Sequence, residues 1–387
     1  MACRSASSAA ASRACRLRTV RRVPCLPLLA ALAAAAGAAP ALPPLPAWSS
    51  SAAVESAFGY KDNLLLSAAG EERSSFLRGS AEFLLMRVPT GSLEYSSFAQ
   101  AEGTRFLQGR TVRNEARVWL RNEAGWRPGP QWEVHLPVTG YYDDKVFDQS
   151  DTELERLTAV LRVFGAVAGP ALRWDFHRSA WLEAETSGQR EKFADHGNDA
   201  WTRHASIRVS VAPHPGLEAG VGLNSRWRDF DFRSQYSAAG RILPGTSLRT
   251  REDEADLRVT FRRGGVSPWQ VALRAGLLDY RDNGSGYFDR REVQLEPEFS
   301  WRPADWELRL RGAARRVEFG VQTVGVGLNP APRIRDEHEV DLRVERRLRP
   351  GWSLFAAFRW ERARSNERIA SYVVNEGLLG LRRSWEK

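Results

Sequence analysis

Apolar and polar residues alternate with a period of two along much of the chain. In the segment 352–361, apolar side chains occupy every second position: Trp352, Leu354, Ala356, Phe358 and Trp360. Arg359 and Glu361 lie on the other face, where Phe355 is the one large apolar residue. Successive side chains of a β-strand point to opposite faces. The pattern therefore predicts a strand whose two faces meet different solvents.

The same alternation recurs in many other segments. It is strict at residues 207–211, 257–262, 307–311 and 340–345. After residue 38, no apolar run approaches the roughly 18 residues that a membrane-spanning helix needs. If the chain enters a membrane, we expect it to cross with strands, because only helices and closed barrels satisfy the backbone there.

Two kinds of connection, short and long, alternate between these segments. Short ones, rich in Pro and Gly, are expected at 88–92, 123–130, 166–171, 212–216, 263–268, 302–305 and 348–351. Longer polar ones are expected near 61–73, 102–110, 143–152, 186–200, 231–252, 281–290, 321–336 and 362–371. These connections join about 16 strands, and an even number allows the first strand to pair with the last. The sequence predicts an all-β protein, a transmembrane antiparallel up-and-down β-barrel of about 14–18 strands.

The segment 154–165 fits two structures. Leu154, Leu157 and Leu161 share one face of a helix that Ser150 or Asp151 would cap. A strand is the prediction here, because a helix would break the alternation of short and long connections.

Tryptophans gather at the ends of the short connections. An indole ring favours the membrane interface, where it meets both hydrocarbon and water. The candidate girdle residues are Trp126, Trp132, Trp269, Trp301, Trp306, Trp352 and, at the other end of its segment, Trp360. The spacing from Trp352 to Trp360 corresponds to about 26 Å along a strand, or about 20 Å across the membrane with a tilt of about 40°. That height is close to the apolar band of such a barrel, so the outer solvent is predicted to be lipid.

The first and last strands carry further features. The segment 58–67, FGYKDNLLLS, has an aromatic-x-Asp-Asn pattern, and the last strand places Gly377, Leu379, Leu381 and Trp385 on one face, interrupted by Arg383. With these features the chain resembles bacterial outer-membrane β-barrel proteins, in particular porin-like families. The resemblance implies a Gram-negative outer membrane, with its lipid, the barrel-assembly machinery and periplasmic chaperones as partners. It also implies passive transport or polymer export.

The first 38 residues have the composition of a secretory signal peptide. They contain six arginines and no acid, followed by an apolar run at 26–36 and the small residues Ala36, Gly37 and Ala38 for cleavage. A membrane anchor is the alternative. The predicted domains are a signal peptide at 1–38, a Pro/Ser-rich linker at 39–52 and the barrel at 53–387. All three cysteines lie in the leader, so the mature chain would have no disulfide or thiolate site.

A barrel of this size encloses an aqueous lumen. The candidate pore-lining residues are Arg208, Arg226, Arg258, Arg274, Arg309, Arg343, Arg359, Glu298, Glu307 and Glu345. Guanidinium groups clamp carboxylates and phosphates with paired hydrogen bonds, so an arginine-lined constriction would favour anions. The alternative is a set of Arg–Glu ladders that stiffen the wall and bind no solute, because acidic residues are interleaved with the arginines.

No residue pattern predicts catalysis, a cofactor, a metal centre or nucleic-acid binding. His196 lies with Asp195 and Asp199, a set that suits either a divalent cation or a solvated loop. His177 and Ser179 supply the residue types of a catalytic dyad, but such close neighbours in a strand should point to opposite or offset faces. The prediction is a porin-like channel or export pore for hydrophilic solutes or polymers, anionic ones included. The alternatives are a structural, assembly or adhesin barrel with a closed lumen, and a lipid-modifying enzyme. The oligomeric state is left open.

Overall fold

The structure is a computed structural model that describes residues 47–68, 71–87, 91–148, 158–194, 197–264, 268–325 and 327–386. The predicted signal peptide, its cleavage site, the start of the segment 154–165 and the His196 cluster lie wholly or partly outside these residues. Among the described residues, no helix is both long and apolar enough to cross a membrane.

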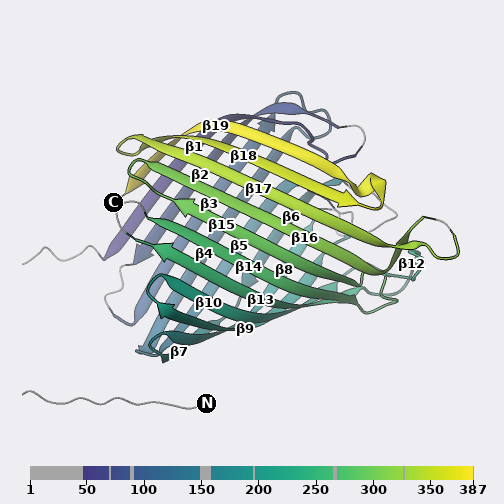
Figure 1. Cartoon of the computed structure of the whole chain (residues 1–387), viewed down its shortest axis with the longest axis horizontal. Coiled ribbons are helices and arrows are strands. Elements are labelled where there is room, and N and C mark those ends of the chain that lie inside the picture. The colour runs from purple at the N-terminus through teal and green to yellow at the C-terminus, as the bar shows by residue number, and fades with distance from the viewer. Residues whose placement is uncertain are drawn as a thin grey trace, which may run out of the picture. The chain divides into compact units, whose positions relative to one another are not determined.

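The described chain forms one large antiparallel sheet that closes into a barrel (Figure 1). Its strands are β1 (Trp48–Lys61), β2 (Ser74–Arg87), β3 (Leu93–Phe106), β4 (Asn114–Gly129), β5 (Trp132–Asp148), β6 (Thr158–Ala168), β7 (Ala171–His177), β8 (Ala180–Phe193), β9 (Ala200–His214), β10 (Leu217–Phe230), β13 (Arg249–Arg263), β14 (Trp269–Asp282), β15 (Arg290–Trp301), β16 (Trp306–Val324), β17 (Ala331–Arg349), β18 (Trp352–Ser365) and β19 (Tyr372–Glu386). A small hairpin of β11 (Gln235–Tyr236) and β12 (Ile242–Leu243) lies in the connection from β10 to β13, and a 3-10 turn (Arg368–Ala370) precedes β19.

Pairing of the first and last strands closes the barrel. β1 and β19 are antiparallel partners from Ser51 opposite Glu386 to Lys61 opposite Glu376. The barrel has 16 crossings, and each pairs with the crossings before and after it along the chain. This confirms the predicted fold class and strand number. β1 begins at Trp48, so part of the expected linker at 39–52 belongs to the wall.

β6 and β7 are two halves of one crossing. Both pair with β5 and with β8, and the register continues unchanged across the break, from Val138 opposite Ala168 to Val134 opposite Leu172. Pro170 has no N–H to donate to the ladder, which interrupts the strand there. The short turn predicted at 166–171 is therefore wrong, because this segment lies within the wall. The turn lies instead between His177 and Ala180, and the strand prediction for 154–165 is confirmed from Thr158 onward.

The alternation along each strand separates an outer from an inner face. On β18, Leu354 and Phe358 on the outer face are 38% and 45% exposed, whereas Phe355 on the inner face is 2% exposed. Large apolar side chains are exposed in the same way around the barrel, for example Ile207, Val221, Leu223, Leu277 and Val293. An apolar belt of this extent marks an interaction surface, and on a closed barrel it fits lipid.

The long connections carry their own apolar clusters. Leu64 in the β1–β2 connection is 1% exposed and belongs to a cluster with Phe76 and Phe106. Tyr287 and Phe288 in the β14–β15 connection pack with Phe230 and Leu248, and Tyr236 of the small hairpin packs against them. These contacts fold the connections back onto the barrel end.

Candidate functional site

A cavity of about 660 Å³ lies inside the barrel between β1–β5 and β15–β19. Eleven basic and eight acidic residues line it, an excess of three positive charges. Apolar side chains near the long connections also line it: Leu66, Val146, Val317, Phe319, Tyr372, Val374 and Leu378. The space is thus polar, charged and weakly positive.

The alternation along the strands places all ten predicted pore-lining residues on the inner face. Arg309, Arg343 and Arg359 line the cavity. Glu307 and Glu345 line a smaller cavity of about 160 Å³ at the short-turn end. Glu298 lies 3.5 Å from Arg311, a cavity residue. The other four arginines, Arg208, Arg226, Arg258 and Arg274, lie on the part of the wall formed by β9–β14 and do not line this cavity.

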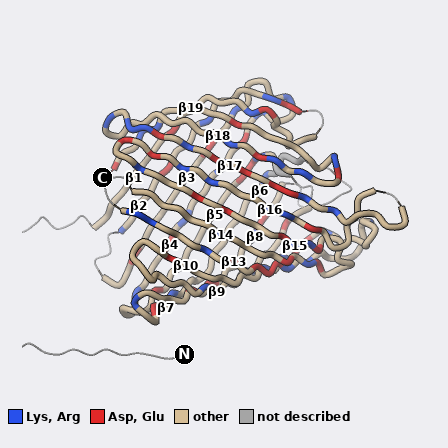
Figure 2. The backbone as a smooth tube through the Cα atoms, in the orientation of Figure 1, with Lys and Arg blue, Asp and Glu red and all other residues tan. Residues whose placement is uncertain are grey.

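Each of the seven predicted arginines has a carboxylate partner. Basic and acidic positions are interspersed along the strands (Figure 2). The pairs are Arg208–Asp256 at 2.9 Å, Arg226–Glu252 at 3.2 Å, Arg258–Asp256 at 3.1 Å, Arg274–Glu296 at 3.2 Å, Arg309–Glu307 at 2.6 Å, Arg343–Glu55 at 2.7 Å and Arg359–Glu339 at 2.7 Å. The wall therefore carries the Arg–acid ladders that the sequence analysis offered as an alternative.

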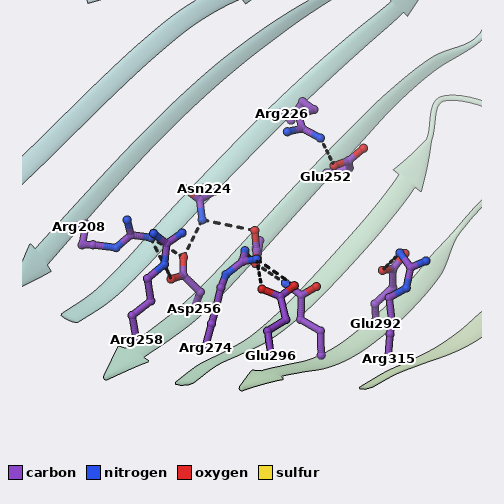
Figure 3. A network of polar contacts seen from close by, with 12 residues as sticks. Arg208, Asn224, Arg226, Glu252, Asp256, Arg258, Arg274, Glu292, Glu296 and Arg315 are labelled. Atoms are coloured by element: carbon purple, nitrogen blue, oxygen red, sulfur yellow. Dashed lines mark hydrogen bonds and ion pairs between the residues drawn. The ribbon is translucent and has the colours of Figure 1, made fainter. Parts of the chain in front are cut away.

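Asp256 is the centre of one such network (Figure 3). Its side chain is fully buried beneath Arg208 and Arg258, and it also accepts a hydrogen bond from Asn224 Nδ2 at 2.9 Å. Gly222, its partner on β10, makes room for these groups, because a Cβ there would lie 2.8 Å from both Arg208 Nη2 and Asp256 Oδ2. The network holds the arginine side chains against the wall instead of letting them extend across the lumen.

A second network crosses the seam where the barrel closes. Glu55 on β1 accepts hydrogen bonds from Arg343 Nη2 at 2.7 Å and from Arg382 Nη1 at 2.6 Å. Arg382 also donates to Glu82 on β2 at 3.1 Å. Sequence reasoning missed Glu55, Glu82 and Arg382, although each occupies a polar position of an alternating segment. That alternation was the signal that could have found them.

The predicted girdle tryptophans lie on the outer face. Trp126, Trp132, Trp269, Trp301, Trp306 and Trp352 are at strand ends beside short turns, and Trp360 is near the long connections. Five further tryptophans on the outer face were not predicted as girdle residues. Trp48, Trp174 and Trp385 lie at the short-turn end of the barrel, and Trp201 and Trp227 lie at the end with the long connections. Trp119 and Trp181 face the interior, where Trp119 stacks on Tyr141 with ring centroids 5.4 Å apart.

His177 and Ser179 contact each other, contrary to the sequence expectation. They flank the β7–β8 turn, and His177 Nδ1 lies 3.0 Å from Ser179 Oγ and accepts a hydrogen bond from Ser179 N at 3.2 Å. His177 is exposed and Ser179 is partly buried, and this geometry caps a turn. Within the described part of the chain, no group of three or more His, Cys, Asp and Glu side chains is arranged to hold a metal ion.

Comparisons with known proteins give structural likeness alone. No protein-family model and no curated protein matches the sequence. Among solved structures, an anion-selective porin from Comamonas acidovorans is 12% identical, with 87% of this chain and 99% of that chain covered and a TM-score of 0.46. Pseudomonas aeruginosa OpdQ is 9% identical, with 88% and 98% covered and a TM-score of 0.46. A loop-deletion mutant of OmpT, an outer membrane protein of Vibrio cholerae, is 11% identical, with 88% and 100% covered and a TM-score of 0.43. These values are too low to carry function from those proteins to this chain.

Proposed function

We propose that the chain is a porin-like channel of the bacterial outer membrane that passes hydrophilic solutes. The observation that carries the proposal is that the same strands expose apolar side chains on the outer face and place many charged side chains on the inner face. Charged groups need water or full pairing, and many of the interior arginines and carboxylates are partly exposed. Water must therefore reach the inside of the wall while lipid covers the outside.

The lining of the cavity supports a preference for anions. Its positive charges exceed its negative charges by three, which favours anions in a confined space with low-dielectric walls. Arg117 and Arg311 keep 42% and 61% of their side chains exposed despite their carboxylate partners, so their guanidinium N–H groups remain available to a solute.

A structural, assembly or adhesin barrel with a closed lumen is the second candidate. The β1–β2 connection favours it, because this connection folds inward and Leu66 lines the cavity. Asn63 Nδ2 fixes the connection by donating to Ser67 O at 2.9 Å and to Val373 O at 3.2 Å. A lipid-modifying enzyme is the third candidate, and the absence of enzymatic activity stays a prediction.

Conductance in planar lipid bilayers tests the channel directly. Protein that is folded, as judged by heat-dependent migration on a gel, should give persistent open steps. Folded protein that gives none would overturn the channel and favour the closed barrel.

The ratio of anion to cation permeability tests the selectivity. The variant Arg309→Gln/Arg343→Gln removes two cavity charges and should lower this ratio. The variant Arg105→Gln/Arg364→Gln removes two exposed arginines of the outer face and should leave the ratio unchanged. An equal response of the two variants would contradict a role for the cavity charges.

We also propose that the leader is removed on export. Periplasmic chaperones then deliver the unfolded chain to the barrel-assembly machinery, which recognises the last strand. Support comes from β19, whose outer face carries Leu379, Leu381 and Trp385 next to the seam with β1. Trp385→Ala should slow insertion in cells and leave refolding into detergent unchanged.

A further inference from the structure

A hollow of about 580 Å³ indents the outer face of the wall across β6–β10. Ala168, Gly188, Arg203 and Trp227 are successive cross-strand partners in one row, and Thr186 pairs with Ala205 in the next. The alternation of side chains puts all six on the outer face, and all six line the hollow.

The hollow forms because small residues meet there. Ala168, Thr186, Gly188 and Ala205 project little from the wall, whereas Ile207, two residues further along β9, is 46% exposed. Arg203 and Trp227 rise at one edge of the hollow, on the side of the long connections. A groove of this kind in a lipid-facing wall suits a single acyl chain.

A cluster of arginines lies at that edge. Arg203 and Arg249 share Asp229, at 2.8 Å and 3.5 Å, and Arg251 pairs with Asp253 at 2.8 Å. Three guanidinium groups thus share two carboxylates. The side chains of Arg203, Arg249 and Arg251 are 69%, 67% and 55% exposed.

The Arg251 guanidinium lies 5.7 Å from the centre of the Trp227 ring, which joins the cluster to the hollow. Arg251 is also directly opposite Arg281 on β14. Like charges at opposed positions of neighbouring strands repel. Asp253 and Asp279, the carboxylate partners of Arg251 and Arg281, offset part of this repulsion, and a bound anion would offset more.

We propose that the hollow and the arginine cluster bind one phosphate-bearing lipid of the outer leaflet, with an acyl chain in the hollow and the phosphate at Arg203, Arg249 and Arg251. Guanidinium groups bind phosphate by paired, charge-assisted hydrogen bonds. The cluster lies just beyond the apolar belt on the side of the long connections, at the level of lipid headgroups. This site is independent of the channel, because it requires a membrane-inserted barrel but no open lumen.

Native mass spectrometry of the folded barrel in detergent micelles tests the site. The probes are bisphosphorylated lipid A, the same lipid with its phosphates removed, and inorganic phosphate. The barrel should retain one bisphosphorylated lipid, and Arg203→Gln/Arg251→Gln should weaken this binding by about tenfold or more. The control Arg105→Gln/Arg364→Gln removes the same charge from other parts of the outer face and should leave binding unchanged.

A second variant tests the hollow itself. Ala205→Phe fills it with an apolar side chain that the lipid-facing wall tolerates, and it should weaken lipid binding while the arginines remain. Equal binding of phosphorylated and dephosphorylated lipid would overturn the proposal, as would equal losses in the arginine variant and its control. Displacement of the lipid by millimolar inorganic phosphate would also overturn it, because the site would then recognise phosphate without an acyl chain.

Discussion

Phe355 on β18 lies directly opposite Gly380 on β19, and its ring occupies the space that a side chain at Gly380 would take. A Cβ at Gly380 would lie 2.6 Å from Phe355 Cζ and 2.6 Å from the backbone oxygen of Ser56 on β1. Arg343 covers the other side of the ring, with its guanidinium carbon 4.0 Å from the ring centre. An aromatic residue on the charged inner face is therefore accounted for, because glycine and arginine enclose it.

Gly380→Ala should destabilise the barrel by about 1–3 kcal/mol, since the new methyl group meets both a packed ring and a backbone oxygen that cannot move far. Urea unfolding of the protein in lipid vesicles, followed by tryptophan fluorescence, measures the effect. Gly377→Ala is the matched control on the same strand, because no atom lies within 4 Å of a Cβ there. Equal stabilities of the two variants would contradict this packing.

Glu55 should be the most sensitive carboxylate of the seam. Its side chain is 15% exposed and bridges Arg343 and Arg382. Glu55→Gln removes the charge that these two guanidinium groups share and leaves Arg343 with Glu345 and Arg382 with Glu82. We expect a loss of about 1–3 kcal/mol in the free energy of unfolding.

Glu298→Gln is the control for this change. Glu298 is 39% exposed and lies 3.5 Å from Arg311, so its loss should cost less than about 1 kcal/mol. The same urea titration compares the two variants, and a larger loss at Glu298 would refute the ranking.

How far the sequence predicts this fold and its interior depends on the range of the interactions. Alternation is local, so it placed Arg343 on the inner face without any knowledge of the barrel. Its partner Glu55 is 288 positions away along the chain. Arg343 is on β17, and the two residues meet only because the pairing of β1 with β19 closes the barrel and brings β1 near β17. No short-range pattern contains that register.

Turn signals were informative but not sufficient. The Gly169-Pro170 pair predicted a turn, yet continuous pairing on both sides keeps it within the wall. The real turn, between His177 and Ala180, contains neither glycine nor proline, and the side chain of His177 caps it. The outer hollow was beyond prediction as well, because it arises from small residues on several strands that are adjacent only in the folded sheet.

Arg383 should contribute to stability through two aromatic rings, although it interrupts an apolar face. Its guanidinium carbon lies 4.8 Å from the ring centre of Trp352 and 5.1 Å from that of Trp385. Arg383→Gln should therefore lower the free energy of unfolding by about 1 kcal/mol, and Arg383→Lys by less. Urea unfolding in vesicles measures both. Arg105→Gln, which removes an exposed arginine of the outer face, should have no effect, and an equal loss there would show that charge alone matters.

Glu72 should make the docking of two long connections depend on pH. Its carboxylate accepts hydrogen bonds from the backbone N–H groups of Arg110 and Thr111, the latter at 3.2 Å, and its backbone oxygen accepts one from Leu64 N at 2.7 Å. Burial alone would raise the pKa of Glu72, but the bonds from Arg110 and Thr111 hold this pKa below its ordinary value. A lowered pKa in the folded state means that the ionised carboxylate stabilises the docked connection.

This stabilisation is complete above the unfolded pKa of about 4.3 and is lost as the pH falls through the lower folded value. Hydrogen exchange at the amides of Arg110 and Thr111, corrected for the intrinsic pH dependence of exchange, should therefore show protection near pH 6 that declines below about pH 4. Glu72→Gln should reduce the protection at pH 6 and remove its pH dependence. Glu71→Gln, at the exposed neighbouring position, should leave both unchanged. Protection in Glu72→Gln that still declines with the wild-type profile would assign the titration to another group.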